Sequence, residues 1–479
     1  MKMRIILLLL CVQCGLMAAE TCVIKNDINP WLDREFTIGN IPECYLKGQT
    51  VPKQSFNKRR LIVPKGTQNA LIGIAEISSK QYIDKLDLKR TGFKAHLMTA
   101  HGGVVLKYDI LIFSNPPENL FFADAQAGVM LLALNVDEQQ KEVEEQIASF
   151  KGLKLEQEFI GQEWSFKPGT RKVKMYVREP SNGVNKNTGF MLLLHNWGGT
   201  YKQTVGWCNV LADRYNVVAI SVDYLQSGEG KVTPGIPYDH GYLQAVDCLR
   251  AIYQVRKQLL DAGATFSERR YYAAGGSGGG NVTLMCNKLA PYTFASIVDM
   301  CGMPGLTDDI AFGKGLNAGY SKDPASPAFV SVDMQEIRDP GNLDHLKIQY
   351  GANPKNKVII VHGLDDSSCS AADKIQIFLN MVAVGFHPDG HFLTQWNVLN
   401  QKSIQKTNHT IGSRLAVIQE FGDDYLLPSP EGALAVQTSR KNDFERSGKV
   451  IYPTKNGRYV VDYSQGTPSI KFEKSPSTK

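Results

Sequence analysis

The stretch that decides the fold is Tyr271-Tyr272-Ala273-Ala274-Gly275-Gly276-Ser277-Gly278-Gly279-Gly280-Asn281. It places a GxSxG pattern between an apolar run typical of a short strand and a helical segment, Asn281–Leu289. A nucleophilic serine needs such a sharp strand-to-helix turn, and glycines two positions before and after it allow close backbone approach. The helix that follows points N–H groups and its positive dipole end toward negative charge developing near the serine. Ser277 is therefore the candidate nucleophile, although a flexible glycine-rich loop has the same composition.

A candidate acid follows another strongly apolar run, Lys357–His362, in the sequence Val361-His362-Gly363-Leu364-Asp365-Asp366. A carboxylate at the end of a strand lies at the carboxyl edge of a parallel sheet, where α/β proteins keep their active sites. Its role would be to hold a catalytic imidazole in the right tautomer. The spacing after His-Gly favours Asp366 over Asp365, and a turn or helix N-cap is the alternative role for an aspartate here.

Three histidines follow this aspartate and compete for the role of base: His387, His391 and His409. The first two flank a Pro-Asp-Gly turn before a predicted strand, Phe392–Leu399, and so belong to the wrong edge of the sheet. His409 follows that strand and directly precedes a predicted helix, Thr410–Phe421. We therefore assign His409 as the base. His195, which precedes the nucleophile at a strand end, is interpreted as a loop-orienting residue.

Residues 166–430 alternate between strand and helix patterns. Several strands are nearly continuous apolar runs, as in Phe190–Leu194 and Val358–Val361. Strands buried on both faces need that composition, so the fold class predicted is α/β, with a mostly parallel sheet covered by helices on both faces. The strands expected are 173–177, 189–195, 216–222, 270–274, 295–300, 357–362 and 392–399. The helices expected are 203–215, 241–260, 281–289, 371–384 and 410–421.

The regions on either side have other patterns. Residues 20–165 carry short strand-like runs broken by turns and predict a small, mainly β N-terminal domain. His96 and His101 lie there and are interpreted as structural or exposed, because no third metal ligand has a supporting spacing. Residues 431–479 form a C-terminal extension rich in Ser, Pro, Lys and Thr, with one strand-like run, Tyr459–Tyr463, that can pair onto either domain.

Residues 1–19 have the order of a secretory signal peptide: basic Lys2 and Arg4, an apolar run, then small residues. We expect a secreted or periplasmic protein. A lipid anchor on Cys11 or Cys14 and a buried N-terminal strand are the alternatives. Removal of this segment leaves seven cysteines: Cys22, Cys44, Cys208, Cys248, Cys286, Cys301 and Cys369. Cys22 and Cys44 are a plausible disulfide, and the other five lie in apolar segments typical of buried thiols.

The composition excludes several classes of function. The chain is 43% hydrophobic and 21% charged, which is ordinary for a globular protein. Without Lys2 and Arg4, 51 basic residues face 47 acidic ones, a balance of +4 that is too mild for nucleic-acid binding or an anionic membrane. No later segment approaches the about 20 apolar residues of a membrane-spanning helix. None of the seven cysteines after residue 19 has the CxxC or His/Cys spacing of a metal site.

These motifs resemble the α/β-hydrolase superfamily, and most closely its dienelactone-hydrolase and prolyl-oligopeptidase-like branch. The resemblance covers residues 170–425 and rests on HNWGG at 195–199, GGSGG at 275–279, HGLDD at 362–366 and His409. It implies an oxyanion hole formed by the backbone N–H groups of Trp197 and Gly278. Asn196 departs from the usual His-Gly pair, which puts the shape of that hole in doubt. The resemblance also implies hydrolysis through an acyl-enzyme intermediate without a cofactor.

Three functions remain open. Prolyl-oligopeptidase-like enzymes carry a large propeller that the N-terminal residues here are too few to build, so the resemblance favours a carboxylic-ester hydrolase over a serine peptidase. The substrate would be a small-molecule or carbohydrate ester, with plant-derived esters included. A non-catalytic binding protein on the same fold is the third possibility. Residues 303–356 are expected to form a cap or lid beside Ser277, and Asp239 is expected to cap the helix that begins at Gly241.

Overall fold

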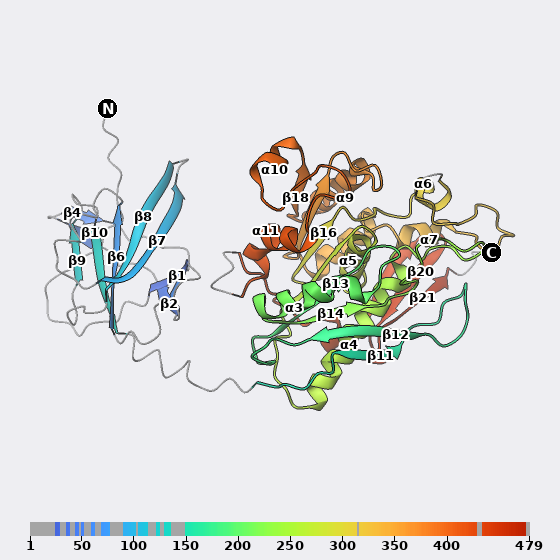
Figure 1. Ribbon diagram of the computed structural model, residues 1–479, viewed down its shortest axis with the longest axis horizontal. Helices are drawn as coiled ribbons and strands as arrows, with labels where there is room; N and C mark the ends of the chain where they lie inside the picture. Colours follow the sequence, from blue (N-terminus) through green and yellow to red (C-terminus); the bar gives the residue numbers. More distant parts are fainter. Residues whose placement is uncertain are drawn as a thin grey trace. The chain divides into compact units, whose positions relative to one another are not determined.

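The computed structural model describes residues 149–313, 316–428 and 434–475, and the backbone of strands β1–β10 between residues 24 and 135 (Figure 1). The chain divides into two compact units, residues 1–147 with 428–435 and residues 148–427 with 436–479. The predicted signal peptide, the Cys22–Cys44 disulfide and the side chains of His96 and His101 lie outside the described residues. No described helix is long and apolar enough to cross a membrane.

The first unit is described through its strands alone. An antiparallel sheet has the order β7-β8-β6-β10-β9, a small closed arrangement joins β1, β2 and β5, and β3 pairs with β4. The bounds are β1 Ile24–Ile28, β2 Glu35–Ile38, β3 Cys44–Leu46, β4 Gln49–Val51, β5 Arg59–Ile62, β6 Asn69–Glu76, β7 Arg90–His101, β8 Val104–Phe113, β9 Phe121–Asp124 and β10 Val129–Asn135.

The second unit is built on an eight-stranded sheet with the order β11-β12-β14-β13-β15-β16-β17-β18. β11 and β12 run antiparallel to their neighbours, and the other strands are parallel. The mostly parallel sheet confirms the alternating pattern of the sequence, and its strand order is that of the α/β-hydrolase fold, as the motif resemblance implied. The bounds are β11 Glu156–Ile160, β12 Lys172–Arg178, β13 Gly189–Leu194, β14 Val217–Val222, β15 Tyr271–Gly276, β16 Ser296–Met300, β17 Lys357–Gly363 and β18 Asp389–Leu393.

Helices cover both faces of this sheet, which explains why its central strands are apolar throughout. In β13, Leu192 and Leu194 belong to the core shared with helices α4, α5, α8 and α9, whereas Met191 and Leu193 belong to the core shared with α3 and α11. The helix bounds are α3 Val205–Arg214, α4 Tyr242–Asp261, α5 Gly278–Leu289, α8 Leu343–Ala352, α9 Ala371–Val384 and α11 Arg414–Leu426, with a short 3-10 helix, η2 Tyr201–Gln203.

The segment after β17 differs from the prediction. The strand expected at 392–399 is wrong, because β18 ends at Leu393 and residues Gln395–Asn400 form helix α10. Thr394 and Asn397 make the reciprocal contacts of a capping box, which starts a helix where the apolar run alone could not distinguish the two structures. The next helix, α11, begins at Arg414 rather than at residue 410, after Ser413 caps it through the N–H of Ala416.

The predicted cap, residues 303–356, contains two different parts. Helices α6 (Asp308–Phe312) and α7 (Val332–Ile337) precede α8, which packs on α5 and α9 and contributes Leu346 to the main core. The earlier part forms a separate apolar cluster in which Met303 and Tyr320 accompany Tyr238, with Trp197 packed against it. This earlier part is therefore the portion of the segment that lies beside Trp197.

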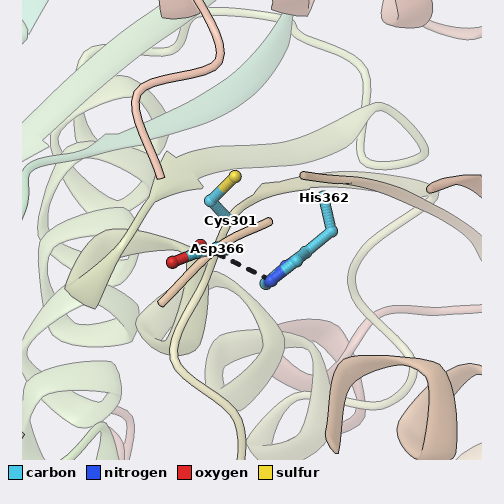
Figure 2. Close-up of side chains that lie close together, drawn as sticks. All are labelled: Cys301, His362 and Asp366. Atoms are coloured by element: carbon cyan, nitrogen blue, oxygen red, sulfur yellow. Dashed lines mark ion pairs between the residues drawn. The ribbon is translucent and has the colours of Figure 1, made fainter. Parts of the chain in front are cut away.

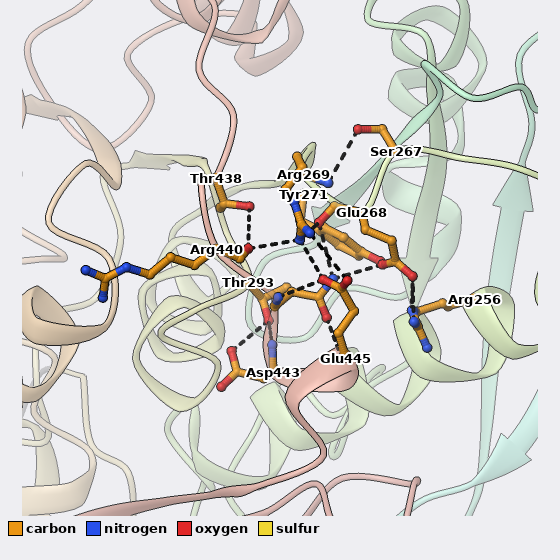
Figure 3. A network of polar contacts seen from close by, with 11 residues as sticks. Arg256, Ser267, Glu268, Arg269, Tyr271, Thr293, Thr438, Arg440, Asp443 and Glu445 are labelled. Atoms are coloured by element: carbon orange, nitrogen blue, oxygen red, sulfur yellow. Dashed lines mark hydrogen bonds and ion pairs between the residues drawn. The ribbon is translucent and has the colours of Figure 1, made fainter.

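The C-terminal extension is more regular than the sequence indicated. Strands β19 (Lys449–Thr454), β20 (Gly457–Asp462) and β21 (Ser469–Lys474) form an antiparallel sheet whose apolar side chains join the main core of the second unit. The short helix α12 (Asp443–Arg446) precedes it. A polar network anchors α12, with Arg269 Nη1 donating to Glu445 Oε2 at 2.6 Å (Figure 3). The predicted strand 459–463 thus pairs within the extension itself.

Candidate active site

Ser277 occupies the turn between β15 and α5 in a strained backbone conformation, with φ 55° and ψ −124°. Non-glycine residues in such regions cost about 1–3 kcal/mol and gather at functional sites. The flanking glycines are required by contact, because a Cβ on Gly279 would lie 2.5 Å from the carbonyl oxygen of His195. A Cβ on Gly275 would lie 2.5 Å from the carbonyl carbon of Gly279. The glycine-rich motif therefore forms a tightly packed turn and not a flexible loop.

The three residues singled out from the sequence lie in one hydrogen-bonded chain. His409 Nε2 is 2.9 Å from Ser277 Oγ, and His409 Nδ1 is 2.8 Å from Asp366 Oδ2. Because an ionised carboxylate accepts only, Nδ1 carries the proton and Nε2 is left free to accept the serine proton. The arrangement can generate a serine nucleophile and hold the imidazolium that results.

The carboxylate of Asp366 is fully engaged. Its Oδ1 accepts hydrogen bonds of 2.8 Å from the backbone N–H groups of Ser368 and Cys369, while Oδ2 accepts from His409. Burial alone would raise the pKa of Asp366, but these hydrogen bonds and the neighbouring imidazole outweigh it and hold the pKa below its ordinary value. Asp366 is therefore a carboxylate anion throughout the neutral range.

A second histidine contacts the same carboxylate (Figure 2). His362, at the end of β17, is completely buried, and its Nε2 lies 3.0 Å from the carbonyl oxygen of Cys369 and 3.5 Å from Asp366 Oδ2. A carbonyl only accepts, so Nε2 carries the proton. Burial and the ammonium of Lys374 lower the pKa of His362, which keeps the ring neutral. This histidine belongs to the HGLDD motif, in which the sequence alone indicates no role for it.

The backbone N–H groups of Trp197 and Gly278, which the resemblance assigns to an oxyanion hole, belong to segments in direct contact. A Cβ on Gly278 would lie 2.6 Å from the backbone nitrogen of Trp197, so the loop after β13 packs directly on the first residue of α5. Within the described residues, neither N–H has a hydrogen-bond acceptor. Gly278 is at the helix start, where N–H groups have no partner inside the helix. The Trp197 ring stacks on Tyr238 at 4.1 Å and donates from Nε1 to Glu229 O, which holds this loop in place.

The competing candidates lie elsewhere. Asp365 accepts a hydrogen bond from the Thr407 hydroxyl, and no contact with the His409 imidazole is found. His391 lies inside β18 rather than before it, 3.1 Å from Asp389, and is not brought to Ser277. His387 precedes β18, and its carbonyl accepts from Lys357 Nζ. The prediction excluded these two histidines because it placed the strand at 392–399, and that position of the strand is wrong.

Two further residues have structural roles. His195 is buried, stacks on Tyr224 and bonds the Asn196 carbonyl and Ser227 hydroxyl at 2.7 Å each, and burial lowers its pKa to about 4. It is a neutral residue that shapes the loop. Asp239 does not occupy the N-cap position of α4 that was predicted for it, although its carboxylate accepts a hydrogen bond from the first turn of that helix. Gly241 occupies that position with φ 84°, where a non-glycine residue would be strained, and Asp239 accepts from the N–H of Gln244.

Sulfur and imidazole donors surround Asp366 in two overlapping groups, Cys301 with His362 and Cys369 with His409. Sequence spacing does not reveal these groups, because they assemble from different strands. The chemistry fits a triad better than a resident metal ion. Burial raises the pKa of Cys301 to about 12 and that of Cys369 further, so both thiols are protonated, and both Asp366 oxygens are occupied by N–H donors.

Comparison with known proteins gives a similarity without an assigned function. A family described as "protein of unknown function (DUF2920)" matches residues 232–465, a range that includes Ser277, Asp366 and His409 but not Trp197. No curated protein matches the chain.

Parts of several solved structures are similar to this chain at low identity. Esterase 2 of Thermogutta terrifontis in its native form is 15% identical over 47% of this chain and 77% of its own, with a TM-score of 0.32. The same enzyme phosphorylated by paraoxon is 12% identical over 50% of this chain and 83% of its own, with a TM-score of 0.34. A puromycin-hydrolyzing peptidase of Mycobacterium tuberculosis is 16% identical over 53% of this chain and 36% of its own, with a TM-score of 0.37.

Proposed function

We propose that this protein is a serine hydrolase that cleaves carboxylic esters through an acyl-enzyme intermediate. The observation that carries the proposal is the chain Ser277–His409–Asp366, with both links at hydrogen-bond distance. Ser277 Oγ attacks the carbonyl carbon as His409 Nε2 takes its proton, and Asp366 stabilises the imidazolium. The N–H groups of Trp197 and Gly278 receive the negative charge on the carbonyl oxygen.

The second half of the reaction uses the same groups. Collapse of the tetrahedral intermediate expels the alcohol, which takes the proton from His409, and leaves an ester bond between the acyl group and Ser277. Water then attacks this acyl-enzyme with His409 as its base. No step requires a group beyond the chain's own residues and water.

A small-molecule or carbohydrate ester is the substrate class we propose, and a secreted or periplasmic location follows from the signal-peptide pattern of residues 1–19. Esters are favoured over amides because alkoxide is the better leaving group and demands less of the general acid. The segment that carries Met303 and Leu306 packs beside Trp197 through buried side chains, and we assign the neighbourhood of Trp197 to substrate binding. Serine peptidase activity is the second candidate.

The test is covalent labelling followed by a substrate panel. A fluorophosphonate should label the wild-type protein at Ser277, and Ser277→Ala should abolish labelling while the circular-dichroism spectrum stays unchanged. Unlabelled wild-type protein would favour a non-catalytic binding protein on this fold. Comparison of acyl esters, acetylated sugars and peptide amides by kcat/KM then separates the two enzymatic candidates, and a preference for amides would refute the ester assignment.

A further inference from the structure

One arginine joins two parts of the candidate active site. Arg414, the first residue of α11, donates from Nη1 to Asn196 Oδ1 in the loop that carries Trp197. Its side chain also lies against Gly276, where a Cβ would come within 2.6 Å of Arg414 Cζ. Gly276 directly precedes Ser277, and Asn196 directly precedes Trp197. A single side chain therefore touches both backbone segments that lead into the oxyanion hole.

The position of Arg414 is electrostatically unfavourable for a cation. The N-terminal end of a helix carries positive partial charge, which destabilises a basic residue there. Burial lowers the pKa of Arg414, and the described residues include no carboxylate within ion-pair distance of its guanidinium. The negative charge of Asp366 offsets part of the cost of burial without forming an ion pair with Arg414, so the contacts with Asn196 and Gly276 are the ones that hold its side chain.

Asn196 has hydrogen-bond partners on its backbone N–H, its backbone carbonyl and its side-chain oxygen. Its N–H donates to Gln203 Oε1 at 2.9 Å, and its carbonyl accepts from the Gly199 N–H at 2.9 Å and from His195. The side-chain oxygen is held by Arg414. Asn196 is the residue that departs from the His-Gly pair of related enzymes, and a glycine there would offer Arg414 no acceptor. Arg414 and Asn196 thus form a contact that a glycine at position 196 could not make.

We propose that Arg414 is a positioning residue that holds the oxyanion loop against the serine turn through Asn196. This inference rests on the proposed hydrolase function. The contact places the Trp197 N–H beside that of Gly278 before substrate arrives, so that no reorganisation is needed as charge develops on the carbonyl oxygen. Arg414 acts on the transition state without touching the substrate, and its loss affects kcat rather than KM.

The experiment is a double-mutant cycle on the full-length protein, with Arg414→Ala, Asn196→Ala and the double variant assayed on the best ester from the panel. We expect each single variant to lose about 10- to 100-fold in kcat with KM nearly unchanged, since small misplacements of catalytic groups cost this much. The double variant should be no slower than either single one. Arg458→Ala, an exposed arginine on β20, is the matched control and should retain wild-type kinetics.

Two additional measurements distinguish positioning from other roles. A boronic acid, which forms a tetrahedral adduct with the serine, should bind Arg414→Ala more weakly in proportion to the loss in kcat, and added guanidinium well below denaturing concentrations should restore part of the activity. Arg414→Lys keeps the charge but not the geometry, and should remain impaired.

Several results would overturn the inference while leaving the hydrolase intact. Additive losses in the cycle would show that Arg414 does not act through Asn196, and wild-type activity in Arg414→Lys would show that charge alone matters. A raised KM with normal kcat would mean that Arg414 contacts the substrate. If Arg414→Ala does not fold, Asn196→Ala alone tests the contact, and normal kcat in that variant refutes it. An inactive, unlabelled wild-type protein would instead refute the proposed function.

Discussion

The buried imidazole of His362 lies against the carboxylate of Asp366, with its Nε2 atom 3.5 Å from Oδ2, the oxygen that also accepts from His409. Two histidines therefore contact this carboxylate oxygen. His409 is also hydrogen-bonded to Ser277, whereas His362 is buried in the core. The Nδ1 atom of His362 is buried, and no hydrogen-bond partner is found for it among the described atoms. The polar contacts of the ring are therefore those of its Nε2–H group, which donates to the Cys369 carbonyl oxygen and lies near Asp366 Oδ2.

Replacing His362 with phenylalanine tests this contact. His362→Phe keeps a ring in the cavity but removes the N–H, and we expect kcat to fall about 2- to 10-fold, the equivalent of one ordinary hydrogen bond. KM should not change, because His362 is buried away from the substrate. In an Asp366→Asn background the same substitution should have no further effect. A full additional loss there would show that His362 does not act through Asp366.

Asp366→Asn is expected to lower kcat by about 10³- to 10⁴-fold, because an amide no longer selects the tautomer of His409 that leaves Nε2 free. The neighbouring residue provides a matched control. Asp365→Asn makes the same chemical change one position away, at a side chain bonded to Thr407 rather than to the imidazole, and should stay within a few-fold of wild type. The reverse order of effects would assign the catalytic acid to Asp365.

A buried ion pair beneath the site should dominate local stability. Lys374 Nζ on α9 lies 2.6 Å from Asp299 Oδ2 on β16, and both side chains are fully buried. Lys374→Met should cost about 3–5 kcal/mol in urea unfolding, because it leaves a buried charge uncompensated. The double variant Lys374→Met/Asp299→Asn should recover most of that loss. Lys257→Met, which breaks an exposed pair on α4, should have no measurable effect. Equal destabilisation by both lysine substitutions would contradict this explanation.

The buried carboxyl group of Asp443 should make the free energy of unfolding depend on pH (Figure 3). Burial raises its pKa to about 7, although the Thr293 hydroxyl and the Tyr292 N–H favour the charged form. An aspartate side chain in the unfolded chain has a pKa of about 3.9. Because the folded pKa is the higher one, the stability that the protonated acid contributes is complete below about pH 4 and is lost as pH rises toward about 7, at up to about 1.4 kcal/mol per pH unit.

Asp443→Asn should remove this dependence, because the amide oxygen can still accept both hydrogen bonds without taking a charge. We expect the stability of the variant relative to wild type, measured by urea unfolding, to increase between pH 5 and pH 8. Asp261→Asn, an exposed position on α4, controls for the general effect of removing a carboxylate. An identical pH profile in wild type and Asp443→Asn would exclude Asp443 as the source.

The sequence predicted those features that depend on short stretches of chain. Apolar runs such as Phe190–Leu194 identified strands buried on both faces, and the spacing around Ser277 identified a turn that admits only glycine at two positions. The ambiguous segments were those in which local pattern does not separate two structures. The run 395–400 alternates polar and apolar residues at its start as a strand does, and the capping contact of Thr394 with Asn397 decides for a helix.

What the sequence determined by itself was the doubly covered parallel sheet and the order in which Ser277, Asp366 and His409 follow its strands, because strand composition and chain order are local properties. Only the tertiary structure decided which atoms meet: Asp366 and not Asp365 at His409, His362 behind the carboxylate, and Arg414 at Asn196. These contacts join residues that are far apart in the chain, and they exist only when the sheet brings the ends of different strands to one edge.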